Sequence, residues 1–408
     1  MRRVVITGMG GITSLGDNWP TIEANLRAGR TGIRRMADWD RYSDLNTRLA
    51  GPIENFSAPP HYPRRMVRSM GRVALMSVRA SEMALANADL LDEPAIRDGR
   101  MGVSYGSSAG SVEPVRAFGQ MLETGRMLGV TSTSYIQMMG HTCAVNIGLF
   151  FGLKGRIIPT SSACTSGSQG IGYAYEAIRF GRQDLMLAGG AEELSALDAA
   201  VFDTLFATST RNDSPGTTPR PFDADRDGLV VGEGAATLVL EELEHARARG
   251  ATIYAEVIGF GCNSDGAHIT QPEAATMATA LELALRDAAL PPSAVGYVSA
   301  HGTATDRGDV AESLATAQVL GHGVPISSLK GHFGHTLGAC GAIEAWLSVE
   351  MMRAGWFAPS ANLQRIEPDC ADLDYLMGDG RELQVEHIMS NNFAFGGINT
   401  SLIFRRAS

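Results

Sequence analysis

Short apolar runs alternate along the chain with stretches whose apolar residues recur at helical spacing. Runs rich in β-branched residues and ended by glycine or polar residues are typical of buried strands, and they include "RRVVITGMG", "LMLAGGAEE", "IYAEVIGFG" and "VGYVSAHGT". The stretches "RVALMSVRASEMALANADL" and "TMATALELALRDAAL" have the period of helices. This alternation predicts an α/β architecture with layered sheets.

The length of the chain predicts more than one structural unit. Its 408 residues exceed the size at which a single hydrophobic core stops growing, which is about 250 to 300 residues. The best internal boundary lies in "EELEHARARGATIYAEV". We therefore expect two intimately packed halves, residues 1–248 and 249–408.

Charge and cysteine content exclude several classes of partner. The formal net charge of -10 argues against nucleic acid as a main partner. No apolar stretch approaches the roughly 20 residues of a membrane span, and the N-terminus lacks a secretory signal. The cysteines are odd in number and have no paired spacing, so we predict neither a disulfide scaffold nor a zinc site and expect a cytoplasmic protein. They are Cys143, Cys164, Cys262, Cys340 and Cys370.

One cysteine is surrounded by small, uncharged residues, in "TSSACTSGSQG". The apolar run "GRIIPT" precedes it as a short buried strand, and the helix-like stretch "IGYAYEAIRFG" follows it. We therefore expect Cys164 on a strand-to-helix turn at a helix N-terminus, where free N–H groups and the helix dipole lower the pKa of a thiol. Small neighbours leave room for another molecule, so Cys164 is a candidate nucleophile.

Three glycine-rich loops carry further candidate residues. His301 follows a short apolar strand in "SAHGTATDRGDVAE", and Lys330, His332 and His335 share the turn in "ISSLKGHFGHTLGACGAIEAW". Glycines of "NNFAFGGIN" are able to expose backbone N–H groups as an anion-binding nest. His332 and His335 are close enough in sequence to suggest a metal pair, but no further ligand lies at a suitable spacing, and we predict no metal site.

The order of these motifs closely resembles the β-ketoacyl-[acyl-carrier-protein] synthases of the type II elongating kind, over essentially the whole chain. The motifs are "SSACTSGSQGIG", "RPFDADRDGLVVGEGAATLVLE", "AHGTATDRGDVAE", "SLKGHFGHTLGACGAIEA" and "NNFAFGGIN". The resemblance implies a thiolase-like fold, with two duplicated halves in five α-β-α-β-α layers. It also implies an acyltransferase that condenses a cysteine-bound acyl chain with a malonyl group, with loss of CO2. Such an enzyme extends the chain by two carbons in fatty-acid or in polyene or polyketide-like biosynthesis.

Catalytic roles follow from the same resemblance. Cys164 matches the nucleophile that takes the acyl group as a thioester. His301 and His335 match two neutral histidines that donate N–H groups to the enolate formed on decarboxylation. Lys330 and Glu312 are expected to form a charged pair that positions and tunes the histidines.

Substrate-binding roles are implied for four more residues. Phe395 matches the phenylalanine that gates access of the malonyl group, and its N–H would join that of Cys164 in an oxyanion hole. Phe393, from the same loop, is a further substrate-binding candidate. Thr303 and Thr305 match threonines that bond the phosphopantetheine arm, although loop hydroxyls also cap local backbone. The arm is carried by the acyl carrier protein, so no permanently bound cofactor is expected.

Some positions depart from the pattern of the family. Ala394 and Ile398 stand where glycine and threonine are usual, and Gly331 stands where serine is usual. Ala109 and Ser134 replace bulkier apolar residues in the stretches that line the acyl pocket. We therefore hypothesise an acyl chain that is rigid or unsaturated rather than plain and saturated.

The expected partner is an acidic acyl carrier protein. The stretch "HYPRRMVRSMGR" supplies a basic cluster in the region where the family places its docking patch, and the other interpretation is a solvated charged face. The cluster consists of Arg64, Arg65, Arg68 and Arg72. No membrane partner is expected.

Three alternatives to a homodimeric elongating enzyme remain. The chain is a ketosynthase that works only as a heterodimer with a chain-length-factor-like partner, or is itself such a non-catalytic partner, or is a thiolase or thioester hydrolase. The presence of Cys164, His301 and His335 argues against a non-catalytic partner. A thiolase needs a second cysteine as base, and the only nearby candidate, Cys340, has the pattern of a helical core residue.

Overall fold

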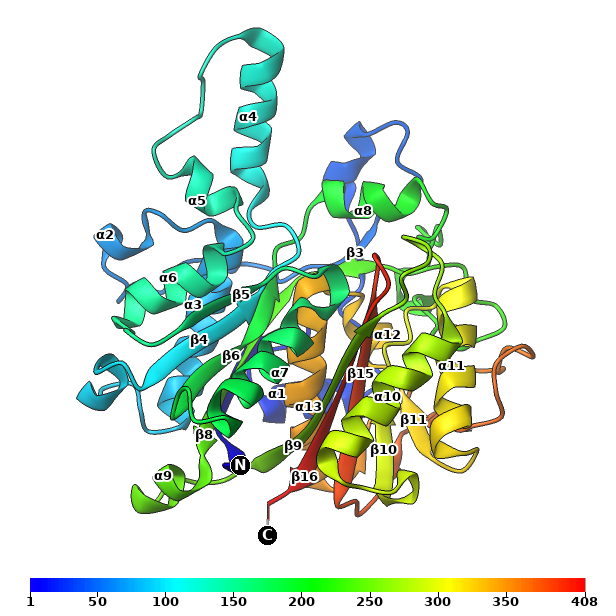
Figure 1. Cartoon of the computed structure of the whole chain (residues 1–408). Helices are drawn as coiled ribbons and strands as arrows, with labels where there is room; N and C mark the ends of the chain where they lie inside the picture. The colour runs from blue at the N-terminus through cyan, green and yellow to red at the C-terminus, as the bar shows by residue number, and fades with distance from the viewer. Residues whose placement is uncertain (408) are drawn as a thin grey trace.

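Two sets of five strands with the same order and pairing form the centre of the molecule, which the computed structural model describes for residues 1–407 (Figure 1). The spatial orders are β5-β4-β6-β8-β1 and β11-β10-β15-β16-β9. In each set the first strand along the chain is antiparallel to the last, the last is antiparallel to the fourth, and the other pairings are parallel. The first set comprises β1 (Val4–Ile12), β4 (Met101–Gly106), β5 (Ile157–Thr160), β6 (Leu185–Glu192) and β8 (Gly234–Glu242). The second comprises β9 (Ala255–Ser264), β10 (Val295–Ser299), β11 (Pro325–Ser327), β15 (His387–Ala394) and β16 (Ile398–Arg406).

Strand pairing also connects the two sets. Val4–Ile6 of β1 pairs with Ala255–Val257 of β9, so the hydrogen-bonded order of strands is continuous. With β13 (Asp374–Tyr375) at the far edge, this order contains eleven strands. Smaller pieces complete the strands: β2 (Arg34–Arg35), β3 (Leu49–Gly51) and β7 (Val231–Gly232) in one sheet, and β12 (Trp356–Phe357) with β14 (Arg381–Glu382) in another.

Helices cover both outer faces and fill the space between the two sets of strands. α7 (Ser166–Arg179) and α13 (Cys340–Ala354) lie in the middle, where each contacts strands of both halves. α3 (Arg72–Asn87) and α6 (Thr142–Phe151) cover the outer face of the first set. α10 (Ala274–Ala288) and α11 (Asp306–Leu320) lie on the outer side of the second set, where α10 packs against β9 and β16. The layers are therefore helix, sheet, helix, sheet, helix, and the predicted thiolase-like fold is confirmed.

The helices nearest the site explain why the central layer is so deeply buried. Residues Cys340–Met352 of α13 are all buried. At the start of the two central helices, a Cβ atom on Gly167 would lie 2.9 Å from the backbone nitrogen of Ala342. A Cβ on Gly341 would lie 2.7 Å from the backbone nitrogen of Ser168. Glycine at both positions therefore lets the two helix N-termini touch.

The remaining helices lie in the connections between strands. None of the helices in residues 1–407 is long and apolar enough to cross a membrane. The connecting helices are α1 (Trp19–Arg27), α2 (Arg64–Val67), α4 (Val112–Thr124), α5 (Ser134–Met138), α8 (Ala196–Asp203), α9 (Leu243–Ala248) and α12 (Lys330–Phe333).

One strand differs from its predicted environment. The run "GRIIPT" was expected to form a buried strand, but β5 is the last strand of the sheet and Ile157 is 42% exposed. Apolar pattern alone does not distinguish a central strand from an edge strand. Nearby, α4 and α5 form an arm that projects from the body (Figure 1), with Leu122, Met127 and Tyr135 exposed.

Candidate active site

Cys164 lies on the turn that connects β5 to α7, as the sequence predicts. It occupies the single 3-10 turn Ala163–Thr165, directly before α7, and Ala163 has the left-handed φ of 50° that brings the chain into this turn. The thiol is almost completely buried. Burial raises the pKa of the Cys164 thiol to about 12, although Lys330 and the N–H of Phe395 act in the opposite direction. The expectation of a lowered pKa is therefore wrong, because desolvation of the thiolate outweighs the charges around it.

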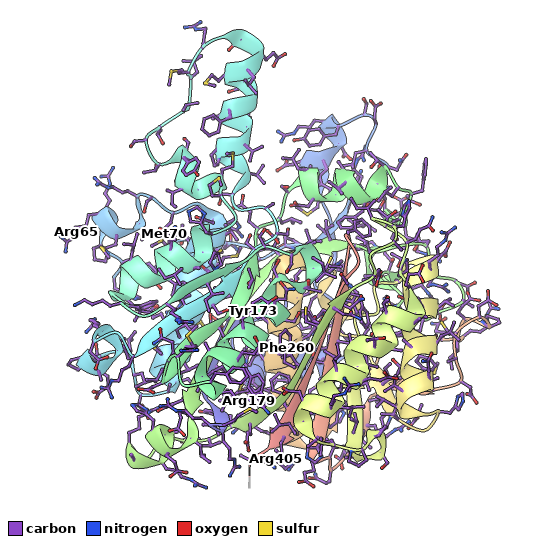
Figure 2. All side chains as sticks on the ribbon, viewed as in Figure 1. Arg65, Met70, Tyr173, Arg179, Phe260 and Arg405 are labelled. Carbon is purple, nitrogen blue, oxygen red and sulfur yellow. The ribbon has the colours of Figure 1, made fainter. Side chains whose placement is uncertain are left out.

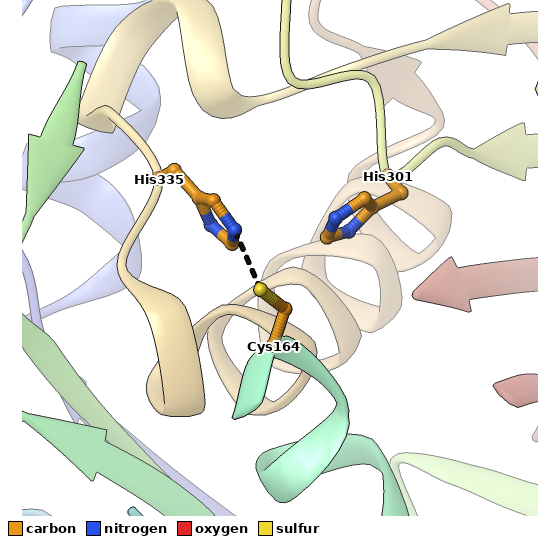
Figure 3. A group of neighbouring side chains, drawn as sticks. All are labelled: Cys164, His301 and His335. Carbon is orange, nitrogen blue, oxygen red and sulfur yellow. Dashed lines mark hydrogen bonds between the residues drawn. The ribbon is translucent and has the colours of Figure 1, made fainter. Parts of the chain in front are cut away.

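His335 approaches the thiol directly. Its Nε2 is 3.0 Å from Sγ of Cys164 (Figure 3). The N–H of Leu337 donates to Nδ1 of His335 at 3.3 Å, so the proton of the neutral ring lies on Nε2. Burial and the charge of Lys330 hold the pKa of His335 well below its ordinary value. His335 thus presents a neutral N–H to the sulfur.

His301 reaches the same point from β10, with its ring centroid 5.1 Å from that of His335. Its Nδ1 lies 3.2 Å from Nζ of Lys330 and 3.4 Å from Nδ2 of Asn392, and both of these groups are donors. The proton of the neutral His301 ring is therefore on Nε2 as well. Burial, followed by the charges of Lys330 and His335, lowers the pKa of His301 well below its ordinary value. The site contains two neutral imidazoles of the same tautomer.

The ion pair of Lys330 differs from the predicted one. Lys330 donates to a carboxylate oxygen of Glu344 in α13, and Nδ2 of Asn392 donates to the other oxygen at 2.7 Å. Burial disfavours the ammonium ion, but Glu344 outweighs it, and the pKa of Lys330 is raised. The predicted pairing of Lys330 with Glu312 is wrong. Glu344 was missed, although a lone acidic residue in the apolar stretch "GACGAIEAW" was a signal for it.

Glu312 instead holds the backbone of the His301 loop. Its two oxygens accept the N–H groups of His301 and Gly302, each at 2.7 Å. One turn earlier in α11, Asp309 accepts the N–H groups of Thr303 and Ala304 at 2.9 and 3.0 Å. Burial raises the pKa of Glu312 to about 8, against the effect of these N–H groups. Two buried carboxyl groups thus fix four consecutive peptide units beside the site.

A cavity of about 520 Å³ leads from the surface to the thiol. Thr303, Thr305 and Arg307 line it, and the hydroxyl oxygens of the two threonines are 2.9 Å apart. Eight of the predicted site residues share this lining: Cys164, His301, Thr303, Thr305, Glu312, His335, Phe393 and Phe395. These side chains come from segments far apart in the sequence and meet at one sulfur.

Aromatic side chains form one wall of the cavity. The ring of Phe395 lies 5.2 Å from that of Phe202 in α8, and Phe202 in turn lies 6.3 Å from the ring of His335. Phe393 also lines the cavity, and its ring lies 6.1 Å from that of His301. Phe202 was missed because nothing in "LDAAVFDTLF" distinguishes it from a core residue of an amphipathic helix.

Two predicted substrate residues are not in the cavity lining. Ala109 is exposed on the loop after β4. Ser134 is buried at the start of α5, where its hydroxyl accepts the N–H of Thr131 at 2.9 Å. The structure does not bring either residue to the thiol, because the segment between them forms the projecting arm. The hypothesis of an unusual acyl chain rested on Ala109 and Ser134, and it has no support from the residues that line the cavity.

Only three of the four arginines of the predicted basic cluster are exposed together. Arg64, Arg65 and Arg68 are exposed on and after α2, and Figure 2 shows Arg65 on the flank of the N-terminal half. Arg72 is instead held by Glu233, with two N–H···O bonds of 2.9 Å. The predicted contribution of Arg72 to a docking face is therefore wrong.

His332, the first histidine of the "GHFGH" turn, does not join His335 at the thiol. The ring nitrogens of His332 lie 3.2 Å from the carbonyl oxygen of Arg30 and 3.1 Å from that of Pro359. The potential ligand atoms of Cys164, His301 and His335 all lie within 4.8 Å of one another. Because both histidines carry their protons on Nε2, this set is arranged to donate hydrogen bonds rather than to ligate a metal.

Comparisons with known proteins find similar chains over the full length of this one. Residues 1–246 match the family model "Beta-ketoacyl synthase, N-terminal domain", and residues 254–364 match "Beta-ketoacyl synthase, C-terminal domain". The chain is 38% identical to 3-oxoacyl-[acyl-carrier-protein] synthase 2 of Vibrio cholerae, over 99% of both chains. A crystal structure of a β-ketoacyl synthase from Burkholderia phymatum is similar with a TM-score of 0.99 and 67% identity, over 100% of both chains. The ishigamide ketosynthase/chain length factor is similar with a TM-score of 0.91 and 31% identity, again over 100% of both chains.

Proposed function

We propose, because this chain belongs to the β-ketoacyl synthase family, that it condenses an acyl group held on Cys164 with the malonyl group of an acyl carrier protein. The observation that carries this proposal is the convergence of one thiol and two neutral imidazole N–H groups at the end of a cavity. This set suits a reaction in which a thioester is formed, an enolate is stabilised and the thioester is then broken.

In the first half-reaction, the sulfur of Cys164 attacks the thioester carbonyl of an acyl carrier protein. The C–S bond to the pantetheine arm breaks, and the proton of Cys164 leaves with the departing pantetheine thiol. The N–H of His335 stabilises the sulfur as it becomes anionic. The backbone N–H groups of Phe395 and Cys164 both act to lower the pKa of the thiol, and we assign them to the developing oxyanion.

In the second half-reaction, the malonyl group loses CO2. The electrons of the broken C–C bond move onto the thioester oxygen, and the Nε2–H groups of His301 and His335 stabilise this enolate. A neutral donor is suited to the step because it stabilises the charge without neutralising the enolate by proton transfer. Lys330, held by Glu344, keeps Nδ1 of His301 as an acceptor and so keeps the proton on Nε2.

The enolate carbon then attacks the acyl carbonyl on Cys164. A C–C bond forms, the C–S bond to Cys164 breaks, and the thiolate takes up one proton from solvent. The product is a 3-oxoacyl thioester that is two carbons longer than the acyl group loaded.

The carrier protein is also the source of the only cofactor in this scheme, its phosphopantetheine arm. We assign Thr303 and Thr305, which line the cavity, to hydrogen bonds with the amides of the arm. We assign Arg64, Arg65 and Arg68, all exposed, to contacts with acidic residues of the carrier protein. The five cysteines are free thiols, which supports a place in the reducing cytoplasm.

A second copy of the chain is the partner we assign to β5 and the projecting arm. β5 is an edge strand with an exposed Ile157, and the arm exposes Leu122, Met127 and Tyr135. A free strand edge is able to pair with another chain, and large exposed apolar patches mark sites of protein–protein contact. The alternative is a heterodimer with a chain-length-factor-like homologue in a polyene or polyketide-like pathway, which the likeness to the ishigamide complex favours.

A condensation assay on Cys164→Ala and Cys164→Gln tests the proposed function. Both variants are expected to lose condensation of acyl and malonyl carrier proteins, because neither is able to hold the acyl group. Cys164→Gln is expected to retain decarboxylation of the malonyl thioester, since His301 and His335 are intact. Condensation at the wild-type rate by either variant would overturn the assignment.

A further inference from the structure

A buried carboxyl group that the proposed mechanism does not use lies at the end of β6. One oxygen of Glu192 accepts the backbone N–H groups of Ser108 at 2.8 Å and of Gly338 at 2.9 Å. The other oxygen accepts the O–H of Ser107 at 3.0 Å. The two serines follow β4 in the first half, whereas Gly338 lies in the 3-10 turn Leu337–Ala339 of the second half. A single carboxyl group therefore joins one segment from each half.

The turn that Glu192 holds also orients His335. Figure 3 shows the chain continuing from His335 into a helical turn beside Cys164. The N–H of Leu337 donates to Nδ1 of His335 at 3.3 Å, and this bond keeps the proton of the ring on Nε2. The next N–H along the chain, that of Gly338, is the one that Glu192 accepts. Glu192 is thus one peptide unit away from the bond that sets the tautomer of His335.

Leu337 adopts a conformation that requires support from its neighbours. Its φ of 47° lies in the left-handed region, which a branched side chain rarely adopts. Such conformations are costly and persist only where the surrounding contacts determine them. A change of the Leu337 backbone toward an ordinary conformation would move two N–H groups, one bound to His335 and the other bound to Glu192. The position of the N–H that serves His335 therefore depends on Glu192.

The charge of Glu192 does not account for its presence at this point. Burial, together with the charge of Asp198, raises the pKa of Glu192 to about 7. The charge of Glu192 also acts to raise the pKa of the Cys164 thiol, which opposes formation of the nucleophile. A buried polar group is costly unless it is hydrogen-bonded. The contribution of Glu192 to the site therefore lies in its three hydrogen bonds.

We propose that Glu192 is a positioning residue that acts through His335. It holds the turn Leu337–Ala339, so that the N–H of Leu337 keeps the Nε2–H of His335 directed at the thiol and at the substrate. This inference rests on the proposed function, in which that N–H stabilises the enolate formed from the malonyl group. Glu192 does not line the cavity, so its effect reaches the reaction through the turn.

Two substitutions separate the hydrogen bonds of Glu192 from its charge. Glu192→Gln removes the charge but retains an oxygen for the two backbone N–H groups. Its amide nitrogen is able to donate to the hydroxyl of Ser107, because a hydroxyl accepts as well as donates. Glu192→Asp retains the charge, but its side chain is about 1.5 Å shorter and no longer reaches the N–H groups of Ser108 and Gly338 together.

The neighbouring Glu193 provides a matched control. Its carboxyl group accepts the N–H groups of Val73 and Val112, at 3.0 and 2.8 Å. It also accepts the O–H of Ser111 at 2.7 Å. Glu193 therefore has the same kinds of donors as Glu192, but none of them belongs to the turn after His335. Glu193→Asp shortens a buried carboxyl group at the same end of β6 without touching that turn.

The rate of decarboxylation is measured with a malonyl carrier protein, since this step depends on the imidazole N–H groups. Complete loss of one oxyanion donor costs about 10²- to 10³-fold, and we expect a misdirected donor to cost about tenfold. Glu192→Asp is therefore expected to lower kcat by about tenfold, with a change in KM of less than about twofold. Glu192→Gln and Glu193→Asp are expected to remain within about twofold of the wild-type kcat. If Glu192→Asp does not fold, Glu192→Asn, which is short and uncharged, replaces it with the same expectation.

The same substitution in a chain without His335 tests whether Glu192 acts through this histidine. His335→Leu already lacks the N–H, so the double variant His335→Leu/Glu192→Asp is expected to decarboxylate within about twofold of the rate of His335→Leu. A general structural effect of Glu192→Asp would instead lower the rate by the same factor in both backgrounds, as independent changes do. That result would contradict the proposal.

Three further results would also contradict it. Glu192→Asp acting at the wild-type rate would show that the turn does not need Glu192. An equal loss in Glu192→Gln would show that the charge of the carboxylate is what the reaction requires, and an equal loss in Glu193→Asp would show that any shortening at the end of β6 is sufficient. Absence of both decarboxylation and condensation in the wild type would contradict the proposed function itself, so the two failures are distinguishable.

Discussion

The two halves of this chain have the same strand order but carry different chemistry at equivalent positions. In the first half, β5 leads through the 3-10 turn Ala163–Thr165 into α7. In the second, β11 leads through the 3-10 turn Leu337–Ala339 into α13. The first residue of each turn is left-handed, with φ of 50° at Ala163 and 47° at Leu337. The second residue of the turn is the nucleophile Cys164 in the first half and Gly338 in the second half.

Crowding explains why the second position of the turn in the second half is a glycine, Gly338. A Cβ on Gly338 would lie 2.6 Å from the backbone nitrogen of Ser108 and 2.7 Å from a carboxylate oxygen of Glu192. The same carboxylate accepts the N–H of Gly338 at 2.9 Å. The turn of the second half is thus used to join the halves, and only the first turn opens into the cavity.

The connections before the two turns differ in length, and this difference supplies the histidine and lysine. Only residues 161–162 separate β5 from its turn, whereas residues 328–336 separate β11 from its turn. The longer connection carries Lys330 and His335. At the ends of β6 and β15, two residues beyond the paired positions Gly190 and Ser390, the halves have Glu192 and Asn392. One half therefore holds the nucleophile, and the other supplies the donors that act on its substrate.

The largest predicted effect comes from breaking the buried ion pair of the second half. Glu344→Leu leaves the ammonium ion of Lys330 without its partner, and we expect the free energy of unfolding to fall by about 3 to 5 kcal/mol in a urea titration. Glu312→Gln, which retains an acceptor for the His301 loop, is expected to cost clearly less. An equal loss of unfolding free energy in both variants would contradict the assignment of Glu344, and not Glu312, as the partner of Lys330.

Next in size is the effect of removing an imidazole N–H. His335→Leu is expected to lower the rate of malonyl decarboxylation by about 10²- to 10³-fold, the usual cost of losing one donor to an oxyanion. His335→Gln is expected to retain more activity, since a glutamine side chain also donates an N–H. If the two variants were equally inactive, His335 would act as a base and not as a neutral donor.

A smaller effect tests the crowding at the second turn. Gly338→Ala is expected to lower the free energy of unfolding by about 1 to 3 kcal/mol, the usual cost of overpacking. Gly119→Ala is the matched control, because a Cβ there has no atom within 4 Å. As a helical Gly-to-Ala change, the control is expected to stabilise by about 0.5 to 1 kcal/mol. A neutral Gly338→Ala would show that the turn has room for a side chain.

The smallest effect concerns pH. The pKa values of His301 and His335 are lowered in the folded state, so the unfolded chain binds more protons below its own histidine pKa of about 6.5. Folding keeps both histidines neutral, and this carries no free-energy cost above about pH 6.5. As the pH falls below about 6.5, the unfolded chain gains protons that the folded chain does not bind, and the free energy of unfolding decreases. From pH 7 to 6 we expect the two histidines to cost about 1 kcal/mol of unfolding free energy.

Buried carboxyl groups have the opposite effect on the pH dependence. Burial raises the pKa of Glu192 to about 7 and that of Asp309 to about 6, so folding favours their protonated forms. The test is therefore the difference between the wild type and His301→Gln/His335→Gln in urea titrations at pH 7 and 6. An identical pH dependence of the two proteins would contradict neutral histidines in the folded state.

Much of the site was predictable because its residues lie in local patterns. Three segments, which surround Cys164, His301 and residues 330–335, each show a strand, a loop of small or glycine residues and a helix in succession. Each of these patterns is contained in about 20 residues. The alternation of apolar runs and helical stretches also predicted an α/β architecture. By itself, the sequence determined which residue types stand at the ends of which strands, because strand ends and helix starts depend on neighbours along the chain.

The tertiary structure decided the quantities that depend on distant neighbours. Burial by both halves raised the pKa of Cys164, where the helix terminus alone predicted a lower value. Packing of α13 between the sheets gave Lys330 the partner Glu344 in place of Glu312, and the place of β5 at the edge of the sheet exposed Ile157. Desolvation, ion pairing and strand order depend on residues that are far apart in sequence, so only the folded chain determines them.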